Sequence, residues 1–132
     1  MLEINHPQTI AEVTALYAQY ETALCDNDIE KLDALFWDSP QVVRFGLLEN
    51  LYGSDAVKAY RRSRSGVKLK RELSNFTVTA FRTDTAIVTL EFRGGIIGKP
   101  AREGRQTQVW QKLPEGWRIV SAHVSWLPSQ NQ

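Results

Sequence analysis

Residues 75–92 read NFTVTAFRTDTAIVTLEF, and their apolar side chains recur at every second position. The alternation runs from Phe76 to Ala80 and again from Ala86 to Phe92. A period of two is typical of a β-strand with one buried face. Arg82-Thr83-Asp84 lies between the two runs and predicts a short hairpin connection. The stretch therefore predicts two antiparallel strands.

The same reading extends to the C-terminal part of the chain. Gly94-Gly95 and the stretch from 98 to 104 interrupt the alternation. Two further strands are predicted at about 105–113 and 117–127, joined by a turn at Pro114-Glu115-Gly116.

The N-terminal part has a helical period instead. In residues 8–26 the apolar side chains fall within an arc of about 120° of an ideal helix. Asp26-Asn27-Asp28 then interrupts the pattern and predicts the cap of a second, short helix that reaches Phe36-Trp37. Gly53-Ser54-Asp55 predicts the start of a third helix from about Ala56 to Arg64. The apolar positions of the first helix are Ile10, Val13, Leu16, Tyr17, Tyr20 and Leu24.

Helices followed by a run of antiparallel strands predict an α+β fold, with the helices packed on one face of a curved sheet. The chain has 132 residues, of which 42% are hydrophobic. That length suits one domain with a proper core, so residues 1–132 are predicted to form a single domain.

Composition narrows the classes of function. The formal net charge is +1, whereas nucleic-acid and membrane-surface binders usually carry a large basic excess. Cys25 is the single cysteine, which suits a reducing compartment. The start of the chain lacks the pattern of a signal peptide, and no run reaches the roughly 20 apolar residues of a membrane span. We expect a cytoplasmic domain that binds neither nucleic acid nor membrane.

Arg44 is the most informative single residue. It lies in VVRFGLL (residues 42–48), which otherwise reads as a strand buried on both faces. A buried guanidinium stays charged and therefore needs a partner. Two readings are open: an internal ion pair, with Glu49, Glu91 or Glu21 as the candidates, or a polar cavity that takes an anionic ligand. The second reading predicts a binding site for a small molecule that bears a carboxylate.

The order of elements, together with the ending GWRIVSAHVS (residues 116–125), resembles the nuclear-transport-factor-2-like superfamily, also called SnoaL-like. More specific segments resemble the AtzH/HpxZ-like family, which is linked to cyanuric acid and oxalurate catabolism. The resemblance covers nearly the whole chain. Its segments are YETAL (20–24), LFW (35–37), VVRFG (42–46), ENLYG (49–53) and GRQTQVW (104–110).

This resemblance implies a cone-shaped α+β barrel with a pocket between the first helix and the concave sheet. It also implies a decarboxylating amidohydrolase that acts on 1,3-dicarboxyurea without a cofactor, with Tyr20 and Arg44 as the catalytic pair. Tyr20 lies on the apolar face of the first predicted helix and so would face the sheet. A tyrosine on such a face can equally be a core aromatic residue.

Further substrate-binding candidates lie mainly on the last two predicted strands. Arg105 is a candidate for holding a second carboxylate, although alternation leaves open whether it or Gln106 faces inward. His123 is a candidate general acid or base, or else a histidine bonded within the sheet. Ser125 shares a face with His123, and Trp37 lies in one of the family segments. We include both as substrate-binding candidates.

A basic run and the spacing of possible metal ligands also bear on function. Residues 58–71 form a basic run without an acidic residue. The run is either a solvated segment or one that attracts anions, and Arg61 or Arg64 could reach the pocket mouth. Its basic residues are Lys58, Arg61, Arg62, Arg64, Lys68, Lys70 and Arg71. Two distant histidines and one cysteine show no metal-ligand spacing, so no metal is predicted.

The rival function is a non-catalytic accessory or ligand-binding subunit of a larger, neighbouring amidase. In both cases we expect a small anionic ligand and a homodimer formed through the outer face of the sheet. The aromatic residues considered for that contact are Trp110, Trp126 and Phe92.

Overall fold

The structure, a computed structural model, describes residues 1–129. Its helices are α1 (Pro7–Asp26), α2 (Ile29–Leu35) and α3 (Ser54–Ser63). The strands are β1 (Val43–Phe45), β2 (Asn50–Tyr52), β3 (Leu69–Phe81), β4 (Thr85–Ile96), β5 (Arg102–Leu113) and β6 (Gly116–Trp126).

The strands form one mixed sheet in the order β2-β1-β6-β5-β4-β3. Neighbouring strands are antiparallel except β1 and β6, which run parallel. The parallel pair arises because the chain leaves the β1–β2 hairpin, builds α3 and three long strands, and returns to the other side of β1. The predicted α+β fold is confirmed, and the one parallel pair departs from the antiparallel pattern expected.

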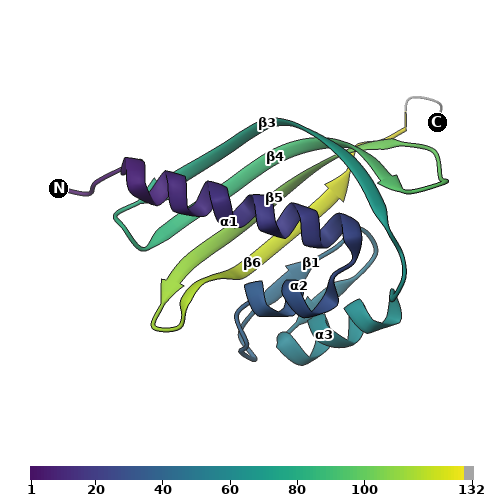
Figure 1. Cartoon of the computed structure of the whole chain (residues 1–132), viewed down its shortest axis with the longest axis horizontal. Coiled ribbons are helices and arrows are strands. Elements are labelled where there is room, and N and C mark those ends of the chain that lie inside the picture. Colours follow the sequence, from purple (N-terminus) through teal and green to yellow (C-terminus); the bar gives the residue numbers. More distant parts are fainter. Residues whose placement is uncertain (130–132) are drawn as a thin grey trace.

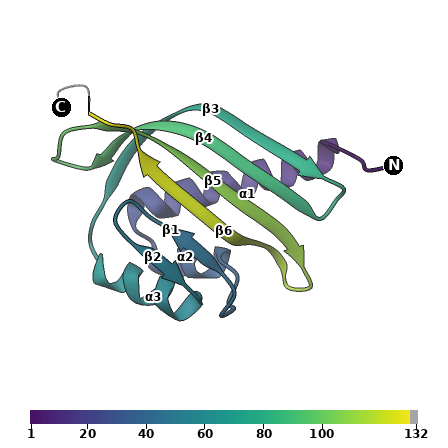
Figure 2. The same cartoon turned by 180° about the vertical axis from the view of Figure 1, so that it is seen from behind.

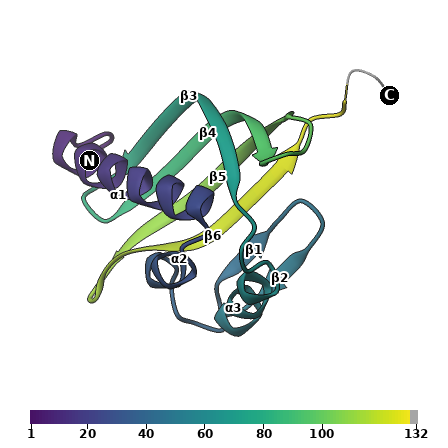
Figure 3. The same cartoon turned by 45° about the vertical axis from the view of Figure 1, so that its right-hand side comes forward.

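The helices lie on one side of the sheet. Figure 1 shows α1 crossing the concave side of β3 to β6, with α2 and α3 beside β1 and β2. Seen from behind, the long strands carry no helix on their outer side (Figure 2). Figure 3 shows the sheet curving around α1, with α3 at the end near β2. This arrangement leaves room between the three helices and the inner face of the sheet.

The helix ends follow from local chemistry. At the end of α1, Asn27 adopts a left-handed conformation with φ 55°, and its N–H donates to the carbonyl oxygen of Leu24 at 3.2 Å. The Asp28 side chain then accepts from the Lys31 N–H at 3.2 Å and caps α2. α2 ends at Leu35, before the predicted Phe36-Trp37, because Phe36 forms a parallel bridge with Ile119 of β6.

The strands β3 and β4 are longer than predicted. β3 already begins at Leu69, and β4 continues through the Gly94-Gly95 pair that was expected to break it. Gly94 pairs with Arg71 in this hairpin, and its φ is 146°. A Cβ atom at Gly94 would clash with the carbonyl oxygen of Lys70. The glycine therefore marks close approach of two strands and not the end of one.

The core lies between α1 and the inner face of the sheet. Trp110 is 0% exposed and Phe92 is 4% exposed, so both belong to the core and not to an outer contact surface. Trp126 is half-buried beneath the Arg102 guanidinium, which lies 3.9 Å from its ring centroid. The homodimer stays a prediction, and Trp110 and Phe92, which were considered for its contact, lie in the core instead. α1 contributes Val13, Tyr17, Tyr20 and Ala23 to this core.

Candidate functional site

A cavity of about 520 Å³ opens between α1, α3 and the inner face of the sheet. Apolar side chains from the β1–β2 hairpin, the β4–β5 hairpin and the start of β3 line part of the cavity. Polar and charged groups come mainly from β1, α3 and the inner face of β3 and β5. A cavity of this size suits a small molecule. The apolar lining residues include Leu47, Leu48, Val67, Leu69, Ile96, Val124 and Trp126.

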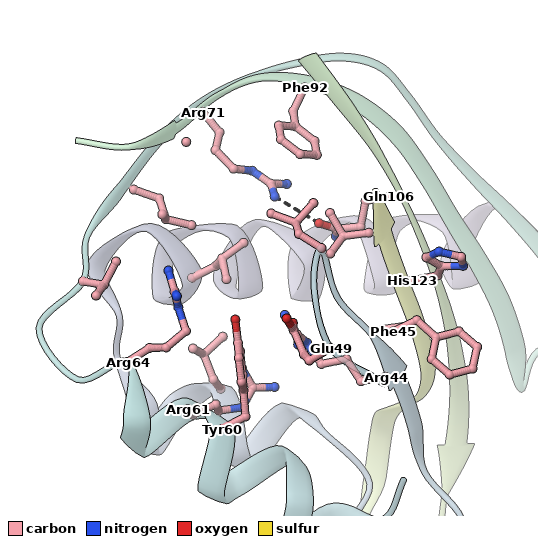
Figure 4. A pocket seen from close by; sticks show the side chains of 18 of the residues that line it. Arg44, Phe45, Glu49, Tyr60, Arg61, Arg64, Arg71, Phe92, Gln106 and His123 are labelled. Atoms are coloured by element: carbon pink, nitrogen blue, oxygen red, sulfur yellow. Dashed lines mark hydrogen bonds and ion pairs between the residues drawn. The ribbon is translucent and has the colours of Figure 1, made fainter. Parts of the chain in front are cut away.

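The charged lining is strongly unbalanced. Among the described residues, the arginines that line the cavity are Arg44, Arg61, Arg64 and Arg71, whereas the only acidic residue is Glu49. Figure 4 shows these side chains converging from different elements on one space. Such an excess of guanidinium groups favours an anionic ligand.

Arg44 combines both readings that the sequence left open. It lies on β1 and lines the cavity, and its Nη1 donates to Glu49 Oε1 at 3.0 Å. The guanidinium also lies over the ring of Tyr60, 5.1 Å from the centroid. The Glu49 carboxylate in turn accepts from the Leu48 N–H at 3.1 Å. Arg44 is therefore a cavity residue whose charge is partly compensated from within.

The β1–β2 hairpin places Glu49 on Arg44. Gly46 donates its N–H to the carbonyl oxygen of Glu49 at 2.9 Å and so closes the turn. A Cβ atom at position 46 would clash with the Glu49 carboxylate. Gly46 therefore allows the glutamate to fold back over the turn and reach Arg44.

Tyr20 lies on α1, is 3% exposed and lines the same cavity. Its ring contacts those of Tyr17 and Phe36, with centroids at 5.6 Å and 6.2 Å. It is thus both a core aromatic residue and a cavity residue. The structure brings Tyr20 and Arg44, the two predicted catalytic residues, to one cavity from separate elements.

Helix α3 contributes three neighbouring side chains to the cavity, and Figure 4 shows Tyr60 and Arg64 extending from it with Arg61 beside Tyr60. Burial raises the pKa of Tyr60, and Glu49 adds to this effect. Burial lowers the pKa of the Arg61 guanidinium; Tyr20 opposes this shift, and Arg44 contributes to it. Tyr20, Arg44 and Tyr60 line the same cavity as Arg61.

Arg61 is buried without satisfied donors. Its side chain is 5% exposed, and Nε lies 3.3 Å from Asp33 Oδ1 without forming a hydrogen bond. Nη2 is also buried and has no hydrogen-bond partner. The guanidinium lies over Phe36, 4.5 Å from the ring centroid. A buried group of this kind normally has partners, so its unused donors indicate a place for an acceptor.

Arg71 is equally buried, but each of its three guanidinium nitrogens donates a hydrogen bond. Its side chain is 4% exposed, and Nε and Nη2 donate to the two oxygens of Glu21 at 3.0 Å and 3.1 Å. Nη1 donates to Gln106 Oε1 at 3.1 Å. Tyr17 donates to Glu21 at 2.8 Å and accepts from Gln106 at 2.9 Å. We call Tyr17, Glu21, Arg71 and Gln106 the Arg71 network.

Burial raises the pKa values of two groups beside this network. Desolvation and then Glu21 raise the pKa of Tyr17 well above its usual range. The same causes raise the pKa of the Cys25 thiol to about 11. Both groups are therefore protonated at neutral pH, and both hydrogen bonds to the Glu21 carboxylate have a donor available.

Gln108 presents a further unused donor at the cavity. It is 1% exposed, and its Oε1 accepts from the Trp110 indole N–H at 3.0 Å. Its Nε2 is buried and has no partner. Like Arg61, Gln108 therefore has a buried donor without a hydrogen-bond partner.

Two predicted substrate-binding residues of the last two strands do not line the cavity. Arg105 is exposed, and its Nε donates to Ser125 Oγ at 2.8 Å. The two residues pair across β5 and β6, on the face opposite to Gln106 and Gln108. The prediction that Arg105 and Ser125 bind substrate in the pocket was wrong, because the alternation places Gln106 and Gln108 inward.

Of the other two substrate-binding candidates, His123 lines the cavity and Trp37 does not. Trp37 lies against Asp38, Val57 and Lys58 in a separate small pocket, because the bridge at Phe36 turns the next side chain away from the cavity. Its predicted role in binding substrate in the large cavity is therefore wrong. His123 does border the cavity, but it is exposed and its ring stands edge-on to Phe45, with centroids 5.6 Å apart.

This geometry can be compared with known proteins. A match to the family described as AtzH-like extends over residues 2–130. The chain belongs to the AtzH-like family. No curated protein matches it in sequence.

Solved structures agree with this assignment. A protein of unknown function from Pectobacterium atrosepticum is 43% identical, with a TM-score of 0.86 over 95% of each chain. A cystatin-like fold protein from Burkholderia xenovorans is 41% identical, with a TM-score of 0.86 over 98% of this chain and 99% of that one. A nuclear transport factor 2-like superfamily protein from Salmonella enterica is 21% identical, with a TM-score of 0.79 over 93% of this chain and 94% of that one, and shows the shared fold.

Sequence reasoning missed the position of Arg71 in the cavity of this AtzH-like protein. It left open the inward face of the strand that carries Gln106 and Gln108, which line the cavity. Arg71 belongs to the basic run, but alternation along β3 turns it inward, while Lys70 and Glu72 lie exposed on either side. That period-two signal was available from residue 69 onward. For Gln106 and Gln108, the available signal was the alternation of the strand, which places them on the face opposite to Arg105.

Two findings bear on other functions. The His, Cys, Asp and Glu side chains of residues 1–129 include no group of three that could hold a metal ion. In the same part of the chain, no helix combines the length and the apolar character that a membrane span requires.

Proposed function

We propose that this AtzH-like protein is a cofactor-free decarboxylating amidohydrolase that acts on a ureido carboxylate such as 1,3-dicarboxyurea, in the catabolism of cyanuric acid or oxalurate. One observation carries the proposal. Tyr20 and Arg44 both line a cavity whose charged lining consists of four arginines and one glutamate among the described residues. The excess of cations supports a ligand with more than one negative charge.

The chemistry needs a proton donor and a group that orients the substrate. In the proposed step, the bond between a urea nitrogen and a carboxyl carbon breaks, and its electron pair stays on the nitrogen. Tyr20 donates a proton to that nitrogen as carbon dioxide leaves, and solvent restores the tyrosine proton. Arg44 binds the departing carboxylate and fixes the direction of the breaking bond. The products are carbon dioxide and a ureido monocarboxylate.

Glu49 has a useful effect on Arg44 in this scheme. A strong ion pair to the departing carboxylate would stabilise the substrate more than the transition state, because the charge disappears as carbon dioxide forms. The Glu49 carboxylate, 3.0 Å from Arg44 Nη1, weakens the ion pair between Arg44 and the substrate, while Arg44 still orients the departing carboxylate.

The test is carbon dioxide release from freshly prepared 1,3-dicarboxyurea by wild type, Tyr20→Phe and Arg44→Ala. Loss of the proton donor is expected to lower kcat by about 100-fold or more, and Arg44→Ala is expected to lower kcat/KM by a similar factor. The matched controls are Tyr52→Phe and Arg105→Ala, because Tyr52 is 65% exposed and neither residue lines the cavity. Both controls are expected to retain wild-type turnover.

A folded wild type that releases no carbon dioxide would contradict the proposal. Co-purification of such an inactive protein with a larger amidase would then favour the accessory-subunit reading. Full activity in Tyr20→Phe would remove Tyr20 from the mechanism.

A further inference from the structure

The positive charge around the cavity is not evenly compensated. Glu49 pairs with Arg44, and Glu21 pairs with Arg71 through both of its oxygens. On α3, however, Arg61 and Arg62 share the single carboxylate of Asp33. Arg64 has no ion pair within residues 1–129 and lies near the Tyr60 ring, 5.8 Å from its centroid. The surplus charge of the site therefore comes from α3.

Arg61 has the geometry of a binding group that lacks its ligand. Its Nε and Nη2 are buried without hydrogen bonds, while the Phe36 ring supports the guanidinium plane at 4.5 Å. A planar guanidinium held in place by packing is well suited to a carboxylate. Asp33 reaches only Nε, at 3.3 Å, and its Oδ1 is itself without a hydrogen bond. The carboxylate already present does not satisfy Arg61.

Position relates this group to the proposed reaction. Arg61 lines the cavity together with Tyr20 and Arg44. Arg64 is the C-cap residue of α3, three residues after Arg61, and extends into the same cavity (Figure 4). A molecule with a carboxylate at each end of a urea group would present one end to Arg44 and the other to α3.

We propose that Arg61, assisted by Arg64, binds the second carboxylate of the substrate and makes the site selective for ureido dicarboxylates over monocarboxylates. This inference rests on the proposed function and adds to it the group that recognises the end of the substrate that is retained. The carboxylate on Arg61 keeps its charge through the reaction. A strong ion pair there stabilises substrate and transition state alike, so it contributes to affinity and not to the barrier.

Calorimetric titration tests the inference with two stable probes. Glutarate carries two carboxylates with the same number of chain atoms between them as 1,3-dicarboxyurea, and glutaramate replaces one of them by an amide. The variants are Arg61→Met, Arg64→Met and the control Arg62→Met. Arg62 is adjacent and shares Asp33, but its side chain is 60% exposed and does not line the cavity.

We expect wild type to prefer glutarate to glutaramate. Arg61→Met is expected to weaken glutarate binding by about 10- to 100-fold and to change glutaramate binding by less than about threefold. Arg64→Met is expected to have a smaller effect in the same direction, and Arg62→Met is expected to bind both probes as wild type does. With 1,3-dicarboxyurea, Arg61→Met should raise KM and leave kcat nearly unchanged.

Unchanged glutarate affinity in Arg61→Met would overturn the inference, and so would equal losses for both probes, which would indicate a structural role. Wild type that binds neither probe would overturn it as well. The two proposals fail separately. Arg61-dependent binding of glutarate without carbon dioxide release would contradict the reaction alone. Release with an unchanged KM in Arg61→Met would contradict only the assignment of Arg61.

Discussion

Two buried arginines, Arg71 and Arg61, line different parts of one cavity, and their surroundings differ sharply. The Arg71 side chain is 4% exposed and donates to Glu21, Gln106 and Tyr17. The Arg61 side chain is 5% exposed, and its Nε and Nη2 form no hydrogen bond among the described residues. Figure 4 shows them on opposite sides of the space, Arg71 above and Arg61 below.

The difference separates structure from recognition. The Arg71 network joins α1 to β3 and β5, and its partners satisfy every nitrogen of the guanidinium. These hydrogen bonds use four of its five N–H groups, so little of its donor capacity remains for a ligand. Arg61 instead carries unused donors beside Tyr20 and Arg44. Burial alone therefore does not identify a binding arginine, whereas the balance of its hydrogen bonds does.

Arg71→Met is expected to have the largest effect, a loss of stability, and it tests the contrast between Arg71 and Arg61. This substitution leaves the Glu21 carboxylate without its cation, and removing one partner of a buried pair is strongly destabilising. Because Glu21 is 17% exposed, we expect a loss of about 3 kcal/mol in the free energy of unfolding, measured by denaturant titration. Arg93→Met, at an exposed position of β4, is the control with little change. A loss below about 1 kcal/mol would show that the network does not hold the fold together.

A smaller effect is expected for Arg61→Met under the same conditions. The change removes a buried cation whose donors are unsatisfied, while Asp33 keeps Arg62 at 3.3 Å and methionine maintains contact with Phe36. The free energy of unfolding should stay within about 1 kcal/mol of wild type. A loss as large as that of Arg71→Met would assign Arg61 to the fold and remove the contrast.

Much of the fold could be predicted because it depends on local periods. The change from a helical period to a period of two locates α1 and the long strands β3 to β6. The ends were less accurate where distant segments decide them. β4 passes through Gly94 because β3 lies against it, and α2 stops at Leu35 because β6 bridges to Phe36.

The site was predicted in part for the same reason. Arg44 was identified because a cation inside an apolar run is visible locally, and its ion pair with Glu49 lies only five residues away. Arg71 was read as part of a solvated or anion-attracting run because its partners, Glu21 and Gln106, lie 50 and 35 residues away. Arg105 was a candidate without an assigned face, because alternation gives two faces without saying which one is concave.

A crystal structure of the protein with glutarate bound would test the central claim most directly. The account predicts one carboxylate of glutarate about 3 Å from the Arg61 guanidinium nitrogens and the other beside Arg44. The Arg71 network should keep its hydrogen bonds to Glu21 and Gln106 unchanged. Glutarate bound to Arg71 in place of Glu21, or bound outside the cavity, would contradict the account.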